Sequence, residues 1–168
     1  MDNKVYYITD KVIDSFTGKY RFLSNFYPVN VKLDGVNYPS VEHAYQAAKT
    51  LDEIKRARIR VANSPARAKL LGSKLKLRDD WKNIKIPIMR QLLTQKFNPE
   101  VNYNLWVKLM NTHPHDLVEG NYWGDIFWGV CNNKGCNHLG KLLMSIRDYY
   151  LNRRYYDTST SGLLSITQ

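Results

Sequence analysis

The chain has 168 residues, of which 43% are hydrophobic and 24% are charged; this suits one soluble globular domain and is too short for two comfortable ones. No apolar run reaches the length of a membrane span or secretory signal, and the two cysteines lie too close together to staple a fold, so we expect no membrane association and a cytoplasmic location, in the host cytoplasm if the source is viral. The 25 Lys and Arg outnumber the 15 Asp and Glu, and the resulting formal charge of +10 favours phosphate-bearing partners such as nucleic acid or a nucleotide.

The strands are predicted near the N-terminus. Residues 4–9 are rich in Val, Tyr and Ile and indicate a short strand. Residues 28–39 alternate apolar and polar side chains on both sides of an Asp34-Gly35 dipeptide, which predicts a β-hairpin.

Helices are predicted to follow. Ser40 is placed to cap a helix whose apolar residues Val41, Ala44, Tyr45 and Ala48 share one face. Pro87 is expected to start, kink or delay the helix that contains it. The remaining predicted elements are a strongly basic helix at 51–62, a helix opened by Ser64-Pro65 and ending near Gly72, helices at 81–97, 101–110 and 138–150, and an extended piece at 117–119.

This inventory predicts a mainly α (α+β) fold. We expect a single compact helical domain over residues 1–151, with a small antiparallel β-hairpin or sheet. Residues 152–168 form the predicted polar C-terminal tail, because apolar periodicity is lost and residues 155–168 look loosely held.

Basic residues are concentrated in two runs, residues 55–60 and residues 67–78. They are either solvated helix faces or an anion-binding surface. The 12 tyrosines and four tryptophans are either core residues or aromatic surfaces that hold bases beside the basic residues.

Residues 125–140 have the composition of a ligand site. Asp125, Trp128 and a run of Gly and Asn precede an apolar helix, so the amides of residues 135–140 are expected to face a ligand near the helix start. The alternative for the segment is an ordinary connector. The alternative for Asp125 is a turn residue that forms a hydrogen bond with the local backbone.

A second candidate lies on the helix that follows the hairpin. Glu42, Gln46 and Lys49 have helical spacing and are expected to line one pocket wall. A carboxylate beside a sugar stabilises an oxocarbenium-like transition state or activates water, and a neighbouring cation tunes its pKa. The alternative is an exposed glutamate with ordinary helical neighbours.

Metal chemistry has little support. The spacing of Cys131, Cys136 and His138 is a weak match to zinc sites, and the chain has no Walker loop, G-x-S-x-G elbow or H-E-x-x-H motif. We therefore expect no metal and no cofactor.

Taken together, several short motifs resemble the NADAR (YbiA-like) family, over roughly residues 21–147. The motifs are R-F-L-S-N-F-Y-P at 21–28, Y-P-S-V-E-H-A-Y-Q-A-A-K at 38–49, D-W at 80–81, K-F at 96–97, L-V-E at 117–119, D-I-F-W-G at 125–129 and G-C-N-H-L-G at 135–140. Pro87, Cys136 and the polar tail depart from the family pattern.

The resemblance implies a mainly helical N-glycosidase that cleaves a bond between a ribose C1 and a nitrogen. By the same resemblance, Glu42 is the essential glutamate, Asp125 the second acid, and Lys49 an amine that stabilises charge or traps an opened ribose as a Schiff base. The substrate contacts that it implies are Asn25, Phe26, His43, Gln46, Trp81, Glu119, Trp128, Gly129, Asn137 and Gly140.

Two substrates fit this resemblance. The first is ADP-ribose on modified guanine bases in DNA or RNA, which the positive charge favours; the second is a phosphorylated intermediate of riboflavin biosynthesis. A noncatalytic ADP-ribose or NAD binding module and a nonspecific nucleic-acid binder are the alternatives from other classes.

Overall fold

The computed structural model describes residues 11–161, with side chains as far as residue 153. The predicted strand at residues 4–9 lies outside the described residues. Residues 16–106 form one compact unit, here the helical unit; residues 11–15 and 107–161 belong to a second, here the α6 unit. The mainly helical fold with small sheets is confirmed.

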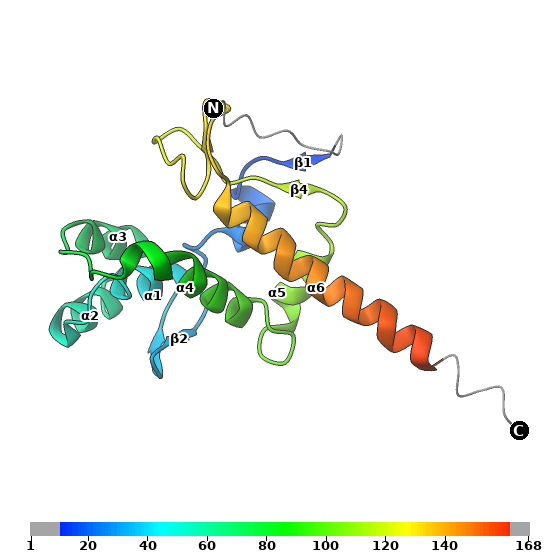
Figure 1. Ribbon diagram of the computed structural model, residues 1–168, viewed down its shortest axis with the longest axis horizontal. Coiled ribbons are helices and arrows are strands. Elements are labelled where there is room, and N and C mark those ends of the chain that lie inside the picture. The colour runs from blue at the N-terminus through cyan, green and yellow to red at the C-terminus, as the bar shows by residue number, and fades with distance from the viewer. Residues whose placement is uncertain (1–10, 162–168) are drawn as a thin grey trace, which may run out of the picture. The chain divides into compact units, whose positions relative to one another are not determined.

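The helical unit contains most of the short helices. Helices α2 and α3 pack beside α1, and α1 also packs on α4, which in turn contacts β2 (Figure 1). Its elements are η1 (Gly18–Leu23), β2 (Val31–Leu33), β3 (Val36–Tyr38), α1 (Val41–Ala47), α2 (Glu53–Arg60), α3 (Pro65–Ser73), α4 (Trp81–Lys96) and the start of α5 (Tyr103–Met110).

The predicted hairpin is confirmed as the antiparallel pair β2 and β3, in which Val31 lies opposite Tyr38. Its two turn residues, Asp34 and Gly35, have φ angles of 49° and 78°. Two consecutive positive φ angles are those of a type I′ turn, whose twist matches that of the strands, and Asp-Gly is a favoured sequence for it.

The helix starts follow the predicted caps. The Ser40 side chain accepts a hydrogen bond from the His43 N–H at the start of α1, and Ser64 does the same for Arg67 in α3. Helix α2 begins later than predicted, because Asp52 caps it by accepting from the Lys55 N–H. Residues 48–52 therefore separate α1 from α2.

Pro87 lies inside α4, which begins at Trp81 as predicted and is not delayed. The proline is exposed, and having no N–H it leaves one helical hydrogen bond unmade.

The α6 unit differs more from the prediction. Its elements are β1 (Val12–Ile13), the end of α5, β4 (Asp116–Leu117), β5 (Gly120–Asn121), β6 (Val130–Cys131) and α6 (His138–Ser161). Strands β1 and β4 lie side by side in Figure 1, and both β1–β4 and β5–β6 are parallel pairs, which the prediction missed. Each strand has two residues, too few for an alternation pattern.

The last helix begins at His138 as predicted and continues to Ser161, so residues 155–161 are helical where a tail was expected. The domain boundary at residue 151 stays a prediction, and residues 162–168 lie outside the described residues. Among the helices of the described part, none has the length and apolarity needed to cross a membrane.

Replacing Gly35 with alanine is expected to lower the free energy of unfolding by about 1 kcal/mol, because alanine disfavours a positive φ. A Cβ at this position meets no atom within 4 Å, so the cost is conformational. Urea unfolding measures it as a lower midpoint with an unchanged slope. Asn37→Ala, at an exposed position of β3, is the control; equal midpoints for Gly35→Ala and wild type contradict the prediction.

Candidate active site

The predicted site residues fall into one group in each unit. The first, here the Glu42 cluster, consists of Glu42, Tyr45, Gln46, Lys49 and Trp81 in the helical unit. The second contains residues of the α6 unit, from Glu119 to Gly140. That both groups line one pocket stays a prediction.

Glu42 is a buried carboxylate, 6% exposed, on the first turn of α1. Gln46 Nε2 donates a hydrogen bond to Glu42 Oε1 at 2.8 Å, across one turn of the helix. A buried carboxylate is costly unless hydrogen bonds and charges compensate it, so this pairing fixes the orientation of the acid as well as its stability. The alternative of an exposed glutamate is therefore wrong.

The backbone of Asn25 also holds Glu42. The Asn25 carbonyl oxygen accepts from the Glu42 N–H at 3.0 Å, and Asn25 Nδ2 lies 3.5 Å from Met89 Sδ. Asn25 Oδ1 is buried and has no hydrogen-bond partner among the described residues. An unsatisfied buried acceptor costs about 1–3 kcal/mol, so a donor from a ligand or water would be favourable there.

Lys49 lies just beyond α1, because the helix ends at Ala47 and the Lys49 N–H bonds back to the Gln46 carbonyl at 3.3 Å. The expected helical stripe therefore ends at Gln46, and Lys49 is joined to it by a turn. Burial lowers the pKa of Lys49; the negative charge of Glu42 opposes this shift, and the positive charge of Lys69 adds to it.

Aromatic rings complete the cluster. Lys49 Nζ lies 5.8 Å from the centroid of the Tyr45 ring, and the Tyr45 and Trp81 rings are 5.2 Å apart. The Trp81 ring, at the start of α4, is largely buried. The amine and the two aromatic rings are therefore linked by contacts within one unit, and the Glu42 carboxylate lies close enough to influence the amine electrostatically.

His43 neighbours Glu42 in sequence but is held by other groups. Ala62 O accepts from His43 Nε2, at 3.1 Å, because a carbonyl can only accept. His43 Nδ1 is then the acceptor for the Ser40 hydroxyl at 2.7 Å. The ring thus connects the start of α1 to the end of α2, and burial lowers its pKa while the bond to Ala62 opposes the shift.

Phe26, another predicted substrate contact, is half-buried, and its N–H donates to Ser24 Oγ.

Gly72 of α3 was not predicted to act on the site. A Cβ on Gly72 would overlap the Gln46 side chain, lying 2.8 Å from Gln46 Cβ. Glycine therefore allows α3 to approach the residue that holds Glu42. No pattern near Gly72 in the sequence indicates this contact, because it joins distant segments.

Lys96 is a second residue that the prediction missed. Its side chain is fully buried at the end of α4, and Nζ donates to the Ser24 carbonyl at 2.7 Å. Nζ also lies 5.6 Å from the Tyr27 ring centroid. Lys96 thus supports the turn that carries Asn25, and its signal in the sequence was a lysine at a core position of an apolar helix face.

In the α6 unit, Asp125 acts on the local backbone. Asp125 Oδ1 accepts from the N–H groups of Phe127 and Trp128, at 3.1 and 2.9 Å. The half-buried Trp128 ring packs edge to face on Phe127, with centroids 5.0 Å apart. Asp125 therefore fixes the backbone that positions Trp128, as the turn alternative expected.

The expectation that the loop amides face a ligand is wrong for residues 136–139. Their N–H groups donate to the carbonyls of residues 126–129, in the order 136 to 126, 137 to 129, 138 to 127 and 139 to 128. Amides that are satisfied by backbone carbonyls cannot also bind a phosphate.

Asn137 and the glycines hold this loop closed. Asn137 Oδ1 accepts from the Glu119 N–H, and Nδ2 donates to the Leu117 carbonyl at 2.9 Å. A Cβ on Gly140 would collide with the Leu117 carbonyl, and one on Gly129 with the Glu119 carbonyl. These residues have packing roles, and their predicted substrate contacts stay predictions.

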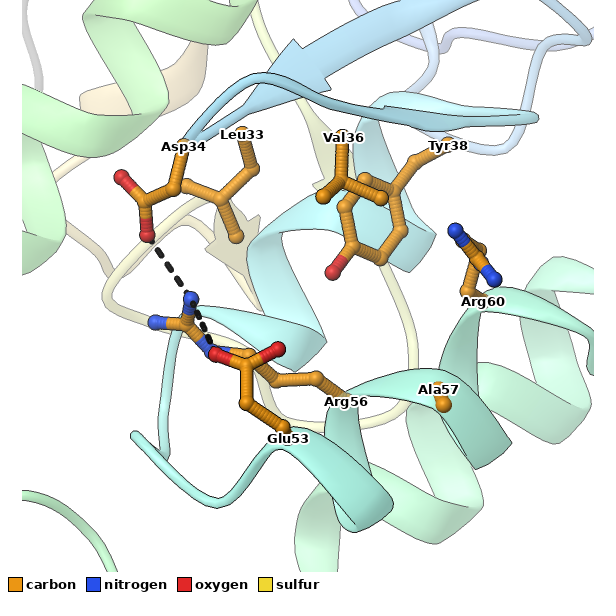
Figure 2. A pocket seen from close by; sticks show the side chains of 8 residues that line it. All are labelled: Leu33, Asp34, Val36, Tyr38, Glu53, Arg56, Ala57 and Arg60. Atoms are coloured by element: carbon orange, nitrogen blue, oxygen red, sulfur yellow. Dashed lines mark hydrogen bonds and ion pairs between the residues drawn. The ribbon is translucent and has the colours of Figure 1, made fainter.

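A separate cavity of about 140 Å³ lies between the hairpin and α2 (Figure 2). Buried Arg56 lines it and donates through Nη1 to Asp34 Oδ2 at 2.8 Å, while Nη2 has no hydrogen-bond partner in the described part of the chain. None of the predicted site residues lines this cavity. Within residues 11–161, no three His, Cys, Asp or Glu side chains are grouped so as to hold a metal.

Comparison with known proteins agrees with the family that the sequence motifs resemble. The NADAR domain family matches residues 13–150. N-glycosidase YbiA of Shigella sonnei is 40% identical over 137 residues, which cover 80% of this chain and 84% of that protein. Riboflavin biosynthesis protein VVA0006 of Vibrio vulnificus is 35% identical over 130 residues, covering 76% of this chain and 35% of that protein.

The NMR structure of the Escherichia coli protein YbiA has a similar fold. Its TM-score is 0.76 at 34% identity, and the match covers 92% of this chain and 94% of that one.

Gly72→Ala is expected to destabilise the protein by about 1–3 kcal/mol, because its Cβ forces Gln46 away from α3. Since Gln46 orients Glu42, turnover should fall more than substrate binding. Unfolding curves and steady-state kinetics measure the two effects. The exposed neighbour Ser73→Ala is the matched control, and a Gly72→Ala protein with wild-type stability overturns this account.

The free energy of unfolding is expected to fall as the pH drops below about 6.5, the ordinary pKa of histidine. The pKa of His43 is lowered in the folded state, so the unfolded chain takes up a proton first and is favoured. In His43→Gln this part of the pH dependence should disappear, whereas exposed His113→Gln should retain it. Unfolding in urea at several pH values from 5 to 8 provides the measurement; parallel pH profiles for His43→Gln and wild type refute the role.

Proposed function

This chain belongs to the NADAR domain family and is an N-glycosidase, and we propose that it releases ADP-ribose from modified guanine bases in nucleic acid. Water adds to ribose C1, the bond from C1 to the base nitrogen breaks, and its electron pair leaves with the base.

The single observation that carries the catalytic assignment is the buried, doubly held Glu42. Its carboxylate accepts from Gln46, and its N–H is bonded to Asn25. A carboxylate held in a low-dielectric site takes a proton from the attacking water and stabilises the positive charge that develops on the ribose. That proton then passes to the departing base.

Lys49 is the second catalytic group in this proposal. Its lowered pKa increases the fraction of neutral amine, which in place of water can attack ribose C1 while the C1–N bond breaks and its electron pair leaves with the base. Cleavage of the bond from C1 to the ring oxygen then gives a Schiff base, which water hydrolyses to free the sugar; the charged form of the amine stabilises a diphosphate instead. Reduction with borohydride distinguishes the two, because only a Schiff base is trapped on the protein.

The substrate is held by hydrogen bonding and by aromatic stacking. Asn25 Oδ1 accepts a hydrogen bond from a ribose hydroxyl, since it lacks a partner among the described residues. The nitrogenous base is held against the ring of Trp81 or that of Trp128. Asp125 assists through the backbone of Trp128.

Nucleic acid is favoured as the carrier of the ADP-ribose by the net charge of +10. Helices α2 and α3 and the turn after them add exposed basic side chains to the helical unit. These are Lys55, Arg58, Arg60, Arg67, Lys69, Lys74 and Lys76. A polyanion is attracted by such a surface more than a small intermediate is.

A phosphorylated intermediate of riboflavin biosynthesis is the second candidate substrate. The name of the Vibrio vulnificus relative supports it, although this chain covers only 35% of that protein. The same atoms of Glu42 would serve, because this substrate also has a ribose C1 joined to nitrogen.

Glu42→Gln is expected to reduce kcat by about 10²–10⁴-fold with little change in substrate affinity, because the amide keeps the shape but cannot take a proton. Glu53→Gln, whose side chain is 80% exposed on α2, is the matched control and should be unaffected. Each protein is offered an ADP-ribosylated guanine oligonucleotide and the riboflavin intermediate side by side.

Release from the oligonucleotide supports the first substrate, and release from the intermediate alone supports the second. Binding without release by wild type, or full turnover by folded Glu42→Gln, overturns the proposed mechanism.

A further inference from the structure

Two large aromatic side chains stand exposed at the tip of the loop before Asp125. Tyr122 is 91% exposed and Trp123 is 53% exposed. Their ring centroids are 5.1 Å apart, with an angle of 80° between the planes. Exposed apolar rings that lie together are typical of binding surfaces.

The loop that carries them is fixed at both ends. Asn121 Nδ2 donates to the Asp125 carbonyl at 2.8 Å, and the Asp125 N–H donates to Asn121 Oδ1 at 3.0 Å. Asn121 Nδ2 also donates to the Val130 carbonyl at 3.2 Å, which joins the base of the loop to β6. Gly124 completes the turn with a φ of 85°. A loop closed in this way needs little ordering when it binds a partner.

The chemistry around the tip fits a nucleic acid. The loop is followed directly by Asp125, which positions Trp128. The neighbouring 132–135 turn carries exposed Lys134, and the Cys136 N–H joins that turn to the Ile126 carbonyl at 2.8 Å. Flat rings stack on bases of any sequence, and a nearby cation contacts the phosphate backbone.

We propose that Tyr122 and Trp123 form a stacking platform for an unpaired nucleobase of the single-stranded nucleic acid that carries the modified guanine. This inference rests on the proposed function, because it assigns the loop to the nucleic-acid part of that substrate. A base in a duplex is already stacked and paired, so the platform favours single strands.

The test compares two substrates that differ only in the flanking nucleotides: ADP-ribosylated guanosine and the same base in a single-stranded oligonucleotide. Tyr122→Ala and Trp123→Ala are each expected to raise KM for the oligonucleotide about tenfold with kcat unchanged, and to leave the nucleoside kinetics unaltered. Tyr122→Phe and Trp123→Phe keep a ring and should retain most of the affinity. Ile126→Ala, at an exposed apolar residue directly after the loop, is the matched control.

Equal losses on both substrates, or no loss on the oligonucleotide, overturn the platform. If wild type cleaves neither substrate, the proposed function fails, and the platform is judged by binding alone. Fluorescence anisotropy of a labelled, unmodified single-stranded oligonucleotide should then show about tenfold weaker binding to Trp123→Ala than to wild type or Ile126→Ala. Equal binding by the three proteins refutes the platform independently.

Discussion

The hydrogen bond between Gln46 and Glu42 is the interaction on which the architecture around the candidate active site depends. A carboxylate buried in a helix start must be paired and held, or it is lost to protonation or unfolding. Ser40 caps that helix, the Asn25 carbonyl receives the Glu42 N–H, and Gly72 leaves room for Gln46. The sequences of these neighbouring elements are therefore constrained by one acid, whose carboxylate accepts a hydrogen bond from Gln46.

The parts of this arrangement that were predictable are local in sequence. The Asp34-Gly35 turn and the Ser40 cap follow from the conformations those residues favour, and both are confirmed. The spacing of Glu42 and Gln46 likewise places them one helical turn apart. Lys49 was placed on the same stripe and lies past the helix end, because sequence periodicity does not indicate where hydrogen bonding stops.

The parts that could not be predicted join distant segments. Gly72 reads as a helix end, and nothing near it in sequence indicates the Gln46 side chain against which it packs. The loop of residues 125–140 has a composition that a ligand site and a tightly packed connector share. Its amides turn inward because carbonyls of residues 126–129 lie opposite them, a pairing that no local pattern encodes. Parallel pairs of two residues are also set entirely by long-range contacts.

Lys96 has a consequence for how the protein acquires its site during folding. Its bond to the Ser24 carbonyl joins residues separated by 72 positions, so the turn under Asn25 lacks this support until α4 is in place. A chain emerging from the ribosome contains Glu42 long before it contains Lys96. Glu42 is therefore synthesised before the residue that supports its neighbouring turn. A truncated product that ends before α4 would contain Glu42 but would lack the Lys96 bond to the turn that carries Asn25.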